Sequence, residues 1–310
     1  MELKDSVEIK RKEIIKWPKV VIIILNWNGC KDTIESLESL KKITYPNYEV
    51  IVIDNGSEGN DADILREKYK DYIKIIKNKE NLGFTGGNNI GIKYAMNNGA
   101  DFIMLLNNDV VVDKRFLEPL IEIAENNFKV GIVGPTIYFY KYPYIINWVG
   151  GTISFWKGLP IRFRGNDRFE EFETLIETDY QDGCAMLVKK EVIEKVGILD
   201  EEYYLYYEDV DFCWRVRIAG YRILVARASK VWHKIASSTG GYESLACIYY
   251  STRNRILFMK KHAKIYHWPT FLFFFGYSIA IRIGKWSIKD KKMMGVKFKA
   301  LINGIHYHFH

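Results

Sequence analysis

Short apolar runs alternate with amphipathic helical segments over the first 125 residues, and this alternation limits the fold more than any other feature of the sequence. The first run, residues 20–25, consists of consecutive aliphatic residues (VVIIIL), as expected of a strand buried on both faces. Strands are predicted at 20–25, 50–53, 72–76 and 101–106, and helices at 31–42, 62–70, 87–97 and 115–125. Because parallel strands need crossover connections, this order predicts an α/β fold with a mostly parallel central sheet flanked by helices.

Three of the predicted strands end in polar residues. Asn26 follows the first strand, Asp54 the second, and residues 107–109 (NND) the fourth. Ligands of open parallel sheets bind beyond the carboxyl ends of the strands, so these side chains predict a shared binding site. A carboxylate beside amide oxygens suits Mg²⁺ or Mn²⁺, which prefer oxygen ligands and are often shared with substrate phosphates. An aspartate in a turn or at a helix start would also explain Asp109, because Asp113 lies nearby.

A glycine-rich stretch, residues 81–91 (NLGFTGGNNIG), opens the third predicted helix. Backbone N–H groups and the helix dipole at such a position can face an anion, although a glycine cluster is more often a tight turn. The sequence contains no G-x-x-x-x-G-K-[ST] motif, which disfavours a P-loop NTPase. The first strand is followed by residues 26–29 (NWNG) instead of G-x-G-x-x-G, which argues against a dinucleotide-binding Rossmann enzyme.

Residues 200–211 contain six carboxylates interleaved with four tyrosines. A solvated acidic loop would explain the charge but not the aromatic crowding. Apolar surroundings raise the pKa of a carboxylic acid and make its carboxylate a better base toward an alcohol. His233 is the histidine with the most specific surroundings, between this cluster and a Ser/Thr/Gly-rich loop, although a single histidine is usually a packed or surface residue.

Eight segments together resemble the inverting family 2 glycosyltransferases that use nucleotide-diphospho-sugars, and within that family the rhamnosyltransferase-like branch. The segments are 20–29, 50–57, 80–91, 102–113, 182–201, 206–223, 231–239 and 249–262. They follow the family's order, so they are specific as a set although no single motif is. The resemblance implies a GT-A fold over residues 18–265, in which a nucleotide-sugar half (18–130) continues without a break into an acceptor half (131–265).

The resemblance implies a donor site at the strand ends. Asn26 and Asp54 would line the nucleoside pocket, with the Asp54 carboxylate bonding to the base or the ribose. The residues implied to close over the sugar and the diphosphate are Asn81, Gly83, Gly86, Gly87 and Asn88. The place of the family's D-x-D motif is taken by Asn107, Asn108 and Asp109. Asp109 would be the metal-binding carboxylate, and Asn107 in place of the first acid lowers the charge at the metal.

The resemblance also implies residues for catalysis and for the acceptor. Asp209, preceded by Glu208, would be the catalytic base, and His233 would be a second ligand of Mn²⁺ or Mg²⁺. The residues implied to lie near the acceptor or a phosphate are Gly183, Cys184, Arg253 and Asn254. The implied reaction moves a sugar, with inversion, from a nucleotide-diphosphate donor to a hydroxyl of a lipid-linked or cell-surface glycan. A nucleotidyltransferase acting on sugar phosphates and a catalytically silent sugar-nucleotide-binding domain are the alternatives.

The tail at residues 266–310 is predicted to be helical, aromatic and basic. Residues 253–310 hold 12 basic residues and one acidic residue, a charge of +11, whereas the first 252 residues carry 33 − 37 = −4. Residues 268–281 (WPTFLFFFGYSIAI) are apolar but too few to span a bilayer, which needs about 20. An aromatic and basic interfacial helix suits an anionic membrane surface. A core helix packed on the catalytic domain and a nucleic-acid patch are the alternatives, and we expect no nucleic acid partner.

The N-terminal residues 1–17 are predicted to be a lead-in, because they are charged and lack the apolar core of about 7–15 residues that a signal peptide has. The four cysteines are far apart and include no C-x-x-C motif, as in proteins that keep their thiols reduced. These features predict a cytoplasmic protein, peripheral on the inner face of the cell membrane.

Overall fold

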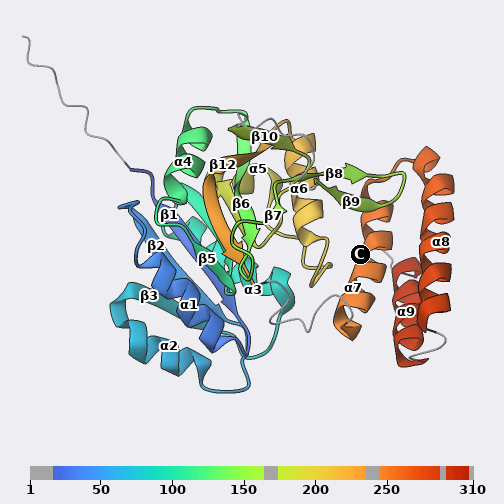
Figure 1. Cartoon of the computed structure of the whole chain (residues 1–310), viewed down its shortest axis with the longest axis horizontal. Helices are drawn as coiled ribbons and strands as arrows, with labels where there is room; N and C mark the ends of the chain where they lie inside the picture. The colour runs from blue at the N-terminus through green and yellow to red at the C-terminus, as the bar shows by residue number, and fades with distance from the viewer. Residues whose placement is uncertain (1–16, 164–173, 235–243, 287–290, 307–310) are drawn as a thin grey trace, which may run out of the picture.

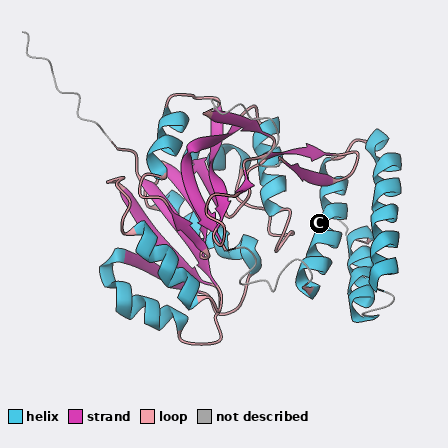
Figure 2. Ribbon diagram, in the orientation of Figure 1, coloured by secondary structure: helices cyan, strands magenta, loops and turns pink. Residues whose placement is uncertain are grey.

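A curved mixed sheet forms the centre of the computed structural model, which describes residues 17–163, 174–234, 244–286 and 291–306 (Figures 1 and 2). Its main path is, in order, β10 (Leu175–Thr178), β12 (Arg222–His233), β6 (Val130–Phe139), β11 (Ala185–Lys189), β4 (Phe102–Asn107), β1 (Val20–Asn26), β2 (Tyr48–Asp54) and β3 (Ile73–Lys77). Two short strands pair beside this path, β5 (Val110–Val112) with β12 and β7 (Ile146–Trp148) with β6. A separate hairpin consists of β8 (Gly151–Ser154) and β9 (Leu159–Arg162). The lead-in predicted at residues 1–17 lies outside the described residues, except for Trp17.

Most strands of the main path run in one direction. The four strands β3, β2, β1 and β4 are mutually parallel, β6 is antiparallel to β11 and therefore parallel to β4, and β12 is parallel to β6. Only β10 and β11 run the opposite way among the strands of this path. The expected α/β fold with a mostly parallel sheet is confirmed. Because β11 is reversed, its first residues lie at the carboxyl end of β4.

Helices cover the sheet on both faces (Figure 1). They are α1 (Cys30–Leu40), α2 (Asp61–Tyr69), α3 (Gly83–Asn97), α4 (Leu117–Glu125), α5 (Lys190–Val196) and α6 (Glu208–Ile218). The four helices predicted in the first half are all present. The third begins at Gly83, earlier than predicted, because the glycine-rich residues themselves form its first turn behind an Asn81 side chain that accepts the Gly83 N–H.

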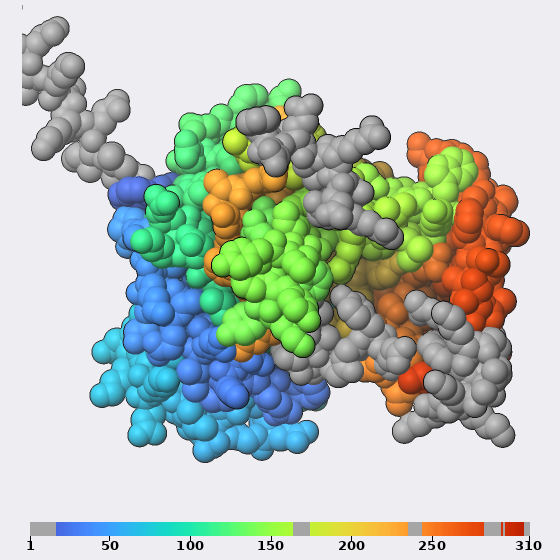
Figure 3. Space-filling view, in the orientation of Figure 1, coloured from blue at the N-terminus to red at the C-terminus, as the bar shows by residue number. Residues whose placement is uncertain are grey.

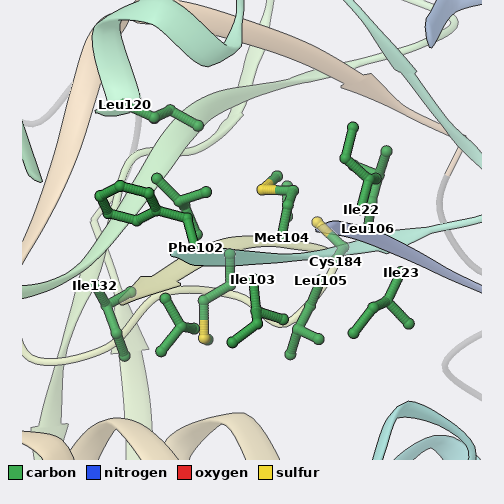
Figure 4. Packing of buried hydrophobic residues seen from close by; sticks show 14 of the residues in the cluster. Ile22, Ile23, Phe102, Ile103, Met104, Leu105, Leu106, Leu120, Ile132 and Cys184 are labelled. Atoms are coloured by element: carbon green, nitrogen blue, oxygen red, sulfur yellow. The ribbon is translucent and has the colours of Figure 1, made fainter. Parts of the chain in front are cut away.

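The core is built from the aliphatic faces of the central strands. Figure 4 shows alternate residues of β4 on opposite sides of the sheet, Phe102, Met104 and Leu106 on one side and Ile103 and Leu105 on the other. All of them are buried, as are the residues of β1 beside them. Each large aliphatic side chain buried in this way contributes about 1.5–3 kcal/mol. This rigid sheet holds the polar strand ends in fixed positions.

The C-terminal helices pack on each other at one end of the molecule (Figures 1 and 3). They are α7 (Leu245–His262), a 3-10 turn (Ile265–His267), α8 (Trp268–Trp286) and α9 (Lys291–Ile305). Phe271 and Phe275 of α8 are buried against Ile256 and Met259 of α7. In α9, Asn303 Nδ2 donates to Tyr249 Oη of α7 at 2.6 Å. Among the residues that the structure describes, no helix is long and apolar enough to cross a membrane.

Candidate active site

Several strand ends meet at one edge of the sheet. Asn26 at the end of β1 lies opposite Asp54 at the end of β2 in the parallel pairing. The backbone N–H of Asn107, at the end of β4, donates to the carbonyl of Cys184 at the reversed start of β11 (2.9 Å). His233 ends β12 and pairs there with β5. The predicted binding edge therefore also includes residues from β11 and β12.

The ends of β1 and β2 form a buried polar network. Asn26 Nδ2 donates to Asp54 Oδ1 at 3.0 Å, and Ser57 Oγ donates to the same oxygen at 2.5 Å. Thr33 Oγ1 donates to Asn26 Oδ1 at 2.7 Å. Asp54 is fully buried, and within the described residues its Oδ2 atom has no hydrogen-bond partner. A buried carboxylate oxygen left unsatisfied is costly, so this atom would be stabilised by a donor that the described residues do not supply.

Asn55, which the sequence reasoning missed, ties β2 to the glycine-rich stretch. Its Nδ2 donates to Asn81 Oδ1 at 2.9 Å and to the Gly83 carbonyl at 3.0 Å. Its Oδ1 accepts the backbone N–H of Leu82 at 3.2 Å. The signal in the sequence was a further polar residue directly after Asp54 at a strand end.

The glycines of this stretch permit close packing. A Cβ atom on Gly87 would lie 2.3 Å from Leu25 Cδ1. Gly83 has φ +74°, and a Cβ there would lie 2.5 Å from the carbonyl oxygen of Tyr204. A Cβ on Gly86 would lie 2.8 Å from the Leu82 Cβ. The stretch is therefore packed between the end of β1 and the loop that carries Tyr204, and Asn88 bonds within it, donating to the Phe84 carbonyl at 2.9 Å.

Asp109 and His233 lie side by side. His233 Nε2 is 3.1 Å from Asp109 Oδ1, and both side chains are largely buried. Burial alone would lower the pKa of His233, but the hydrogen bond and charge of Asp109, with a further contribution from Asp182, raise it above its usual value. Asn108 points away from this pair, because its Nδ2 donates to Thr33 Oγ1 at 3.1 Å.

The Asp109–His233 pair fits a divalent metal that also has other ligands. In the part of the chain that the structure describes, no group of three or more His, Cys, Asp or Glu side chains could hold a metal ion. The pair thus offers two protein ligands, a carboxylate oxygen and an imidazole nitrogen. Metals shared with substrate phosphates are bound in this way, with the remaining positions taken by phosphate oxygens and water.

Glu208 and Asp209 form the first turn of α6, beyond the start of β11. Asp209 Oδ2 accepts the Gly183 N–H at 3.1 Å, and Oδ1 accepts the Val210 N–H at 2.8 Å. Burial, followed by the charge of Asp182, raises the pKa of Asp209 to about 6. Burial and the neighbouring Asp209 raise the pKa of Glu208 well above its usual value, and no partner of Glu208 Oε2 is found among the described residues. Asp209 is therefore the carboxylate of this pair that ionises more readily.

Asp182 connects the two parts of the site. Its charge raises the pKa of both Asp209 and His233, so it lies close to Asp209 and to the Asp109–His233 pair. Arg162 of β9 is 3.7 Å from Asp182 and lowers the pKa of both neighbours. Asp182 belongs to a segment quoted for the family resemblance, but nothing in the sequence indicated that β11 would place it here.

The acidic cluster at residues 200–211 has two parts. Asp209 lies against Gly183, whereas Asp200, Glu202 and Asp211 contact α7. Asp211 accepts hydrogen bonds from Tyr203 Oη at 3.1 Å and from Arg215 Nε at 2.8 Å, and its Oδ1 is 2.6 Å from His262 Nε2. Lys261 of α7 forms ion pairs with Asp200 and Glu202. These carboxylates anchor α6 and its preceding loop to α7, around a hollow of about 440 Å³ that none of the predicted site residues lines.

Two of the residues expected near the acceptor have buried side chains. Gly183 lies against Asp209, as its N–H bond shows. The Cys184 side chain is buried near Met104 and Leu106 (Figure 4), and its thiol also lies within hydrogen-bonding reach of the Asp182 carboxylate. Asn254 is fully buried and donates to backbone carbonyls of residues 203–206. The buried Asn254 amide is therefore satisfied within the protein. That Gly183 and Cys184 lie near the acceptor, and that Asn254 lies near a phosphate, stay predictions.

Arg253, like Asn254, bonds to backbone carbonyls of the segment before Glu208. Its Nη2 donates to the carbonyls of Glu202 at 2.6 Å and Tyr203 at 2.9 Å. Its guanidinium also lies over the rings of Tyr249 and Tyr250. The side chain thus supports the same loop as Asn254.

Comparison with known proteins agrees with this geometry. The sequence profile of Glycosyl transferase family 2 matches residues 21–197, more than half of the chain. The chain is 26% identical to the low-salt glycan biosynthesis hexosyltransferase of Haloferax volcanii, over 76% of this chain and 74% of that protein. It is 24% identical to a dTDP-rhamnosyl transferase of Shigella flexneri, over 78% of this chain and 80% of that protein.

A solved structure confirms the GT-A type of fold. The mannosyltransferase of Pyrobaculum calidifontis, in complex with GDP-Man and Mn²⁺, superposes with a TM-score of 0.59 at 13% identity. The match covers 94% of this chain and 87% of that one. Together with the profile match and the two relatives, this places the protein among known sugar transferases: the chain belongs to glycosyl transferase family 2.

Proposed function

We propose that the protein is an inverting, metal-dependent glycosyltransferase that moves a sugar from a nucleotide-diphosphate donor to a hydroxyl of a lipid-linked or cell-surface glycan. The observation that carries the proposal is Asp209. Its carboxylate has a pKa raised to about 6 and lies within the electrostatic reach of Asp182, which also acts on His233. A base with such a pKa is available near neutral pH and is basic enough to accept a proton from an alcohol.

The donor binds along the carboxyl ends of β1, β2 and β4. Asp54 Oδ2, buried and without a partner in the described residues, accepts a hydrogen bond from the base or the ribose. Asp109 and His233 would hold the metal, whose positive charge would offset the charge that develops on the departing diphosphate. Mn²⁺ fits this pair better than Mg²⁺, because Mg²⁺ is bound almost entirely through oxygen ligands. Asn26 keeps the Asp54 carboxylate in place through its 3.0 Å hydrogen bond.

The reaction is a single displacement. The acceptor oxygen forms a bond to the anomeric carbon while the bond from that carbon to the diphosphate oxygen breaks, and the nucleoside diphosphate leaves with the electron pair. Asp209 takes the proton of the acceptor hydroxyl, and the Gly183 N–H at 3.1 Å orients its carboxylate. Holding both substrates in one site removes much of the entropic barrier.

A nucleotide-release assay tests the proposal directly. A panel of dTDP-, UDP- and GDP-sugars is incubated with the protein, with and without Mn²⁺, together with extracted lipid-linked glycans as acceptors. We expect release of one nucleoside diphosphate that depends on Mn²⁺ and is stimulated by acceptor. Absence of both release and Mn²⁺-dependent binding across the panel would contradict the proposal.

The raised pKa of Asp209 predicts a pH dependence. Because the base works only as the carboxylate, kcat/KM at saturating Mn²⁺ should rise with pH through about 6 and then level off. Burial and the charge of Asp182 raise the pKa of Asp209, whereas the N–H groups of Gly183 and Val210 and the charge of Arg162 lower it. On the same helix turn, burial and the charge of Asp209 raise the pKa of Glu208. Asp182→Asn retains an acceptor for the Cys184 N–H but removes the charge, so the midpoint should move to lower pH. A midpoint that stays in place in this variant would contradict the assignment.

A membrane surface is the second partner that we propose, in keeping with a protein on the inner face of the cell membrane. Helix α8 exposes Leu272, Phe273, Tyr277 and Ile281, and residues 268–281 include no charged side chain. Phe273, Tyr277 and Ile281 are spaced four residues apart and therefore share one face of the helix. The charge of +11 over residues 253–310 complements anionic lipid, at about 1 kcal/mol per Lys or Arg near the surface.

Vesicle flotation tests this contact. The protein should float with phosphatidylglycerol-containing vesicles and less with pure phosphatidylcholine vesicles, and Phe273→Glu with Tyr277→Glu should weaken binding about tenfold or more. Phe128→Glu is a matched control, because Phe128 is exposed but follows α4 and lies in a different part of the chain. Equal flotation of the control and the α8 variant would argue against the contact.

A further inference from the structure

The loop Tyr203–Tyr207, directly before Glu208 and Asp209, has an unusual backbone. Tyr204, Tyr206 and Tyr207 have φ values of 63°, 66° and 74°. Side chains larger than glycine rarely adopt this left-handed conformation, and it persists only where surrounding contacts enforce it. The position of Asp209 thus depends on whatever holds this loop.

Asn254 of α7 holds it. The side chain is fully buried, and its Nδ2 lies 2.8 Å from the Tyr203 carbonyl, 2.8 Å from the Leu205 carbonyl and 2.6 Å from the Tyr206 carbonyl. Its Oδ1 accepts Arg253 Nε at 2.8 Å, which turns the amide so that the nitrogen faces the loop. One side chain therefore bonds to the loop on both sides of Tyr204.

The same loop also touches the donor side of the site. The Tyr204 carbonyl accepts the backbone N–H of Thr85 at 3.2 Å, and the Tyr204 ring lies where a Cβ of Gly83 would be. At its other end, Tyr207 Oη donates to the Gly158 carbonyl at 2.8 Å. The loop thus connects the glycine-rich stretch to the first turn of α6, which carries the base.

We infer that Asn254 is a positioning residue for glycosyl transfer: by directing its two N–H groups at the carbonyls of the loop Tyr203–Tyr207, it fixes where Asp209 lies relative to the donor. Asn254 touches no substrate and acts only through the backbone. The inference rests on the proposed function in one respect, the role of Asp209 as base. Asp54 and His233 end strands β2 and β12, and Asp109 lies between β4 and β5, so the nucleoside and metal residues make no bond to this amide.

Asn254→Asp is the informative variant, because it keeps the shape of the side chain but removes both N–H donors and places a carboxylate oxygen beside the carbonyls. We expect kcat to fall about 100-fold, since a displacement of about 1 Å costs that much, while the KM of the donor changes by less than about threefold. Hydrogen exchange at the amides of residues 203–209, followed by mass spectrometry, should accelerate in the same variant. Exchange is measured without substrate, so it tests the loop even if no donor of the panel is turned over.

Asn89→Asp is the matched control. Asn89 is equally buried, and its Nδ2 donates to the Leu199 carbonyl at 2.9 Å and to Glu201 Oε1 at 3.0 Å, outside the loop Tyr203–Tyr207. It should lower the melting temperature as Asn254→Asp does, but leave exchange at residues 203–209 unchanged. If Asn254→Asp does not fold, Asn254→Ser keeps one donor and should give a smaller change in the same direction.

The outcomes distinguish a failure of the proposed glycosyltransferase function from a failure of the positioning role of Asn254. A wild-type protein that turns over no donor, but whose loop exchanges faster in Asn254→Asp, would refute the proposed function and leave Asn254 as the anchor of the loop. A turnover that stays within about threefold in Asn254→Asp, or one that falls equally in Asn89→Asp, would overturn the positioning role. Loop exchange that is unchanged in Asn254→Asp would overturn it as well.

Discussion

Asp209→Asn should lower the kcat of glycosyl transfer by about 10²–10⁴-fold, the range that a positioned general base contributes. Asparagine has the same shape, and its one amide oxygen can keep one of the two N–H bonds that Asp209 accepts, from Gly183 at 3.1 Å and from Val210 at 2.8 Å. What is lost is the proton acceptor, because an amide oxygen is far less basic than a carboxylate. The measurement is kcat and donor KM with the donor that the release panel identifies, and the donor KM should change little.

Asp211→Asn provides a matched control for this variant. Asp211 lies two residues further along α6, but it contacts Arg215, His262 and Tyr203 and not the base. Removing its charge weakens a buried ion pair, and breaking such pairs costs up to about 3–5 kcal/mol of stability. We therefore expect a lower melting temperature with most of the turnover retained in the folded protein. A kcat that stays near the wild-type value in a folded Asp209→Asn protein would refute the base assignment.

Asp109→Ala should abolish the stimulation by Mn²⁺ and weaken Mn²⁺-dependent binding of the nucleoside diphosphate by about 100-fold or more. Loss of groups that only orient a metal ligand already costs 10–100-fold in metal affinity, so loss of a ligand itself should cost at least as much. The variant also removes the carboxylate 3.1 Å from His233 Nε2, which raises the pKa of that histidine. The remaining imidazole would then be the only protein ligand of the pair.

Titration calorimetry of the nucleoside diphosphate, with and without Mn²⁺, measures this effect. Asp113→Ala serves as the control, because Asp113 follows β5 and its Oδ1 accepts the Arg115 N–H at the start of the next helical turn. It should leave binding of the diphosphate unchanged. If Asp109→Ala binds the diphosphate as tightly as the wild type and with the same Mn²⁺ dependence, the metal site lies elsewhere.

The local patterns of the sequence were sufficient for the first half of the fold and for the polar strand ends. Runs such as Val20–Leu25 predict buried strands because periodicity is a local property, and parallel strands bring their carboxyl ends to one edge. Asn26, Asp54 and Asp109 could be placed on this basis. His233 could be assigned only from the family resemblance, since its proximity to Asp109 depends on the pairing of β12 with β5.

The remaining parts of the site depend on contacts between distant segments. Asp182 reaches Asp209 and the Asp109–His233 pair because β11 is inserted in reverse between β4 and β6, which no local pattern indicates. Part of the acidic cluster faces α7 instead of the site, because α7 pairs Lys261 with Asp200, 61 residues apart, and His262 with Asp211, 51 residues apart. Spacing alone gave no reason to expect that Asn254 would be buried against backbone carbonyls.

Adjacent residues of α7 face two different partners, and this bears on how family members can be recombined. Asn254 bonds the loop before Asp209, whereas Arg255 donates to the Lys157 carbonyl at 3.1 Å and to Ser278 Oγ of α8 at 3.3 Å. A chimera that exchanges only residues 266–310 with a relative would leave Arg255 facing a foreign helix. Arg255 is adjacent to Asn254, which bonds the loop Tyr203–Tyr207. The C-terminal helices are therefore not an interchangeable module, and a functional graft has to carry α7 and the β8–β9 hairpin with them.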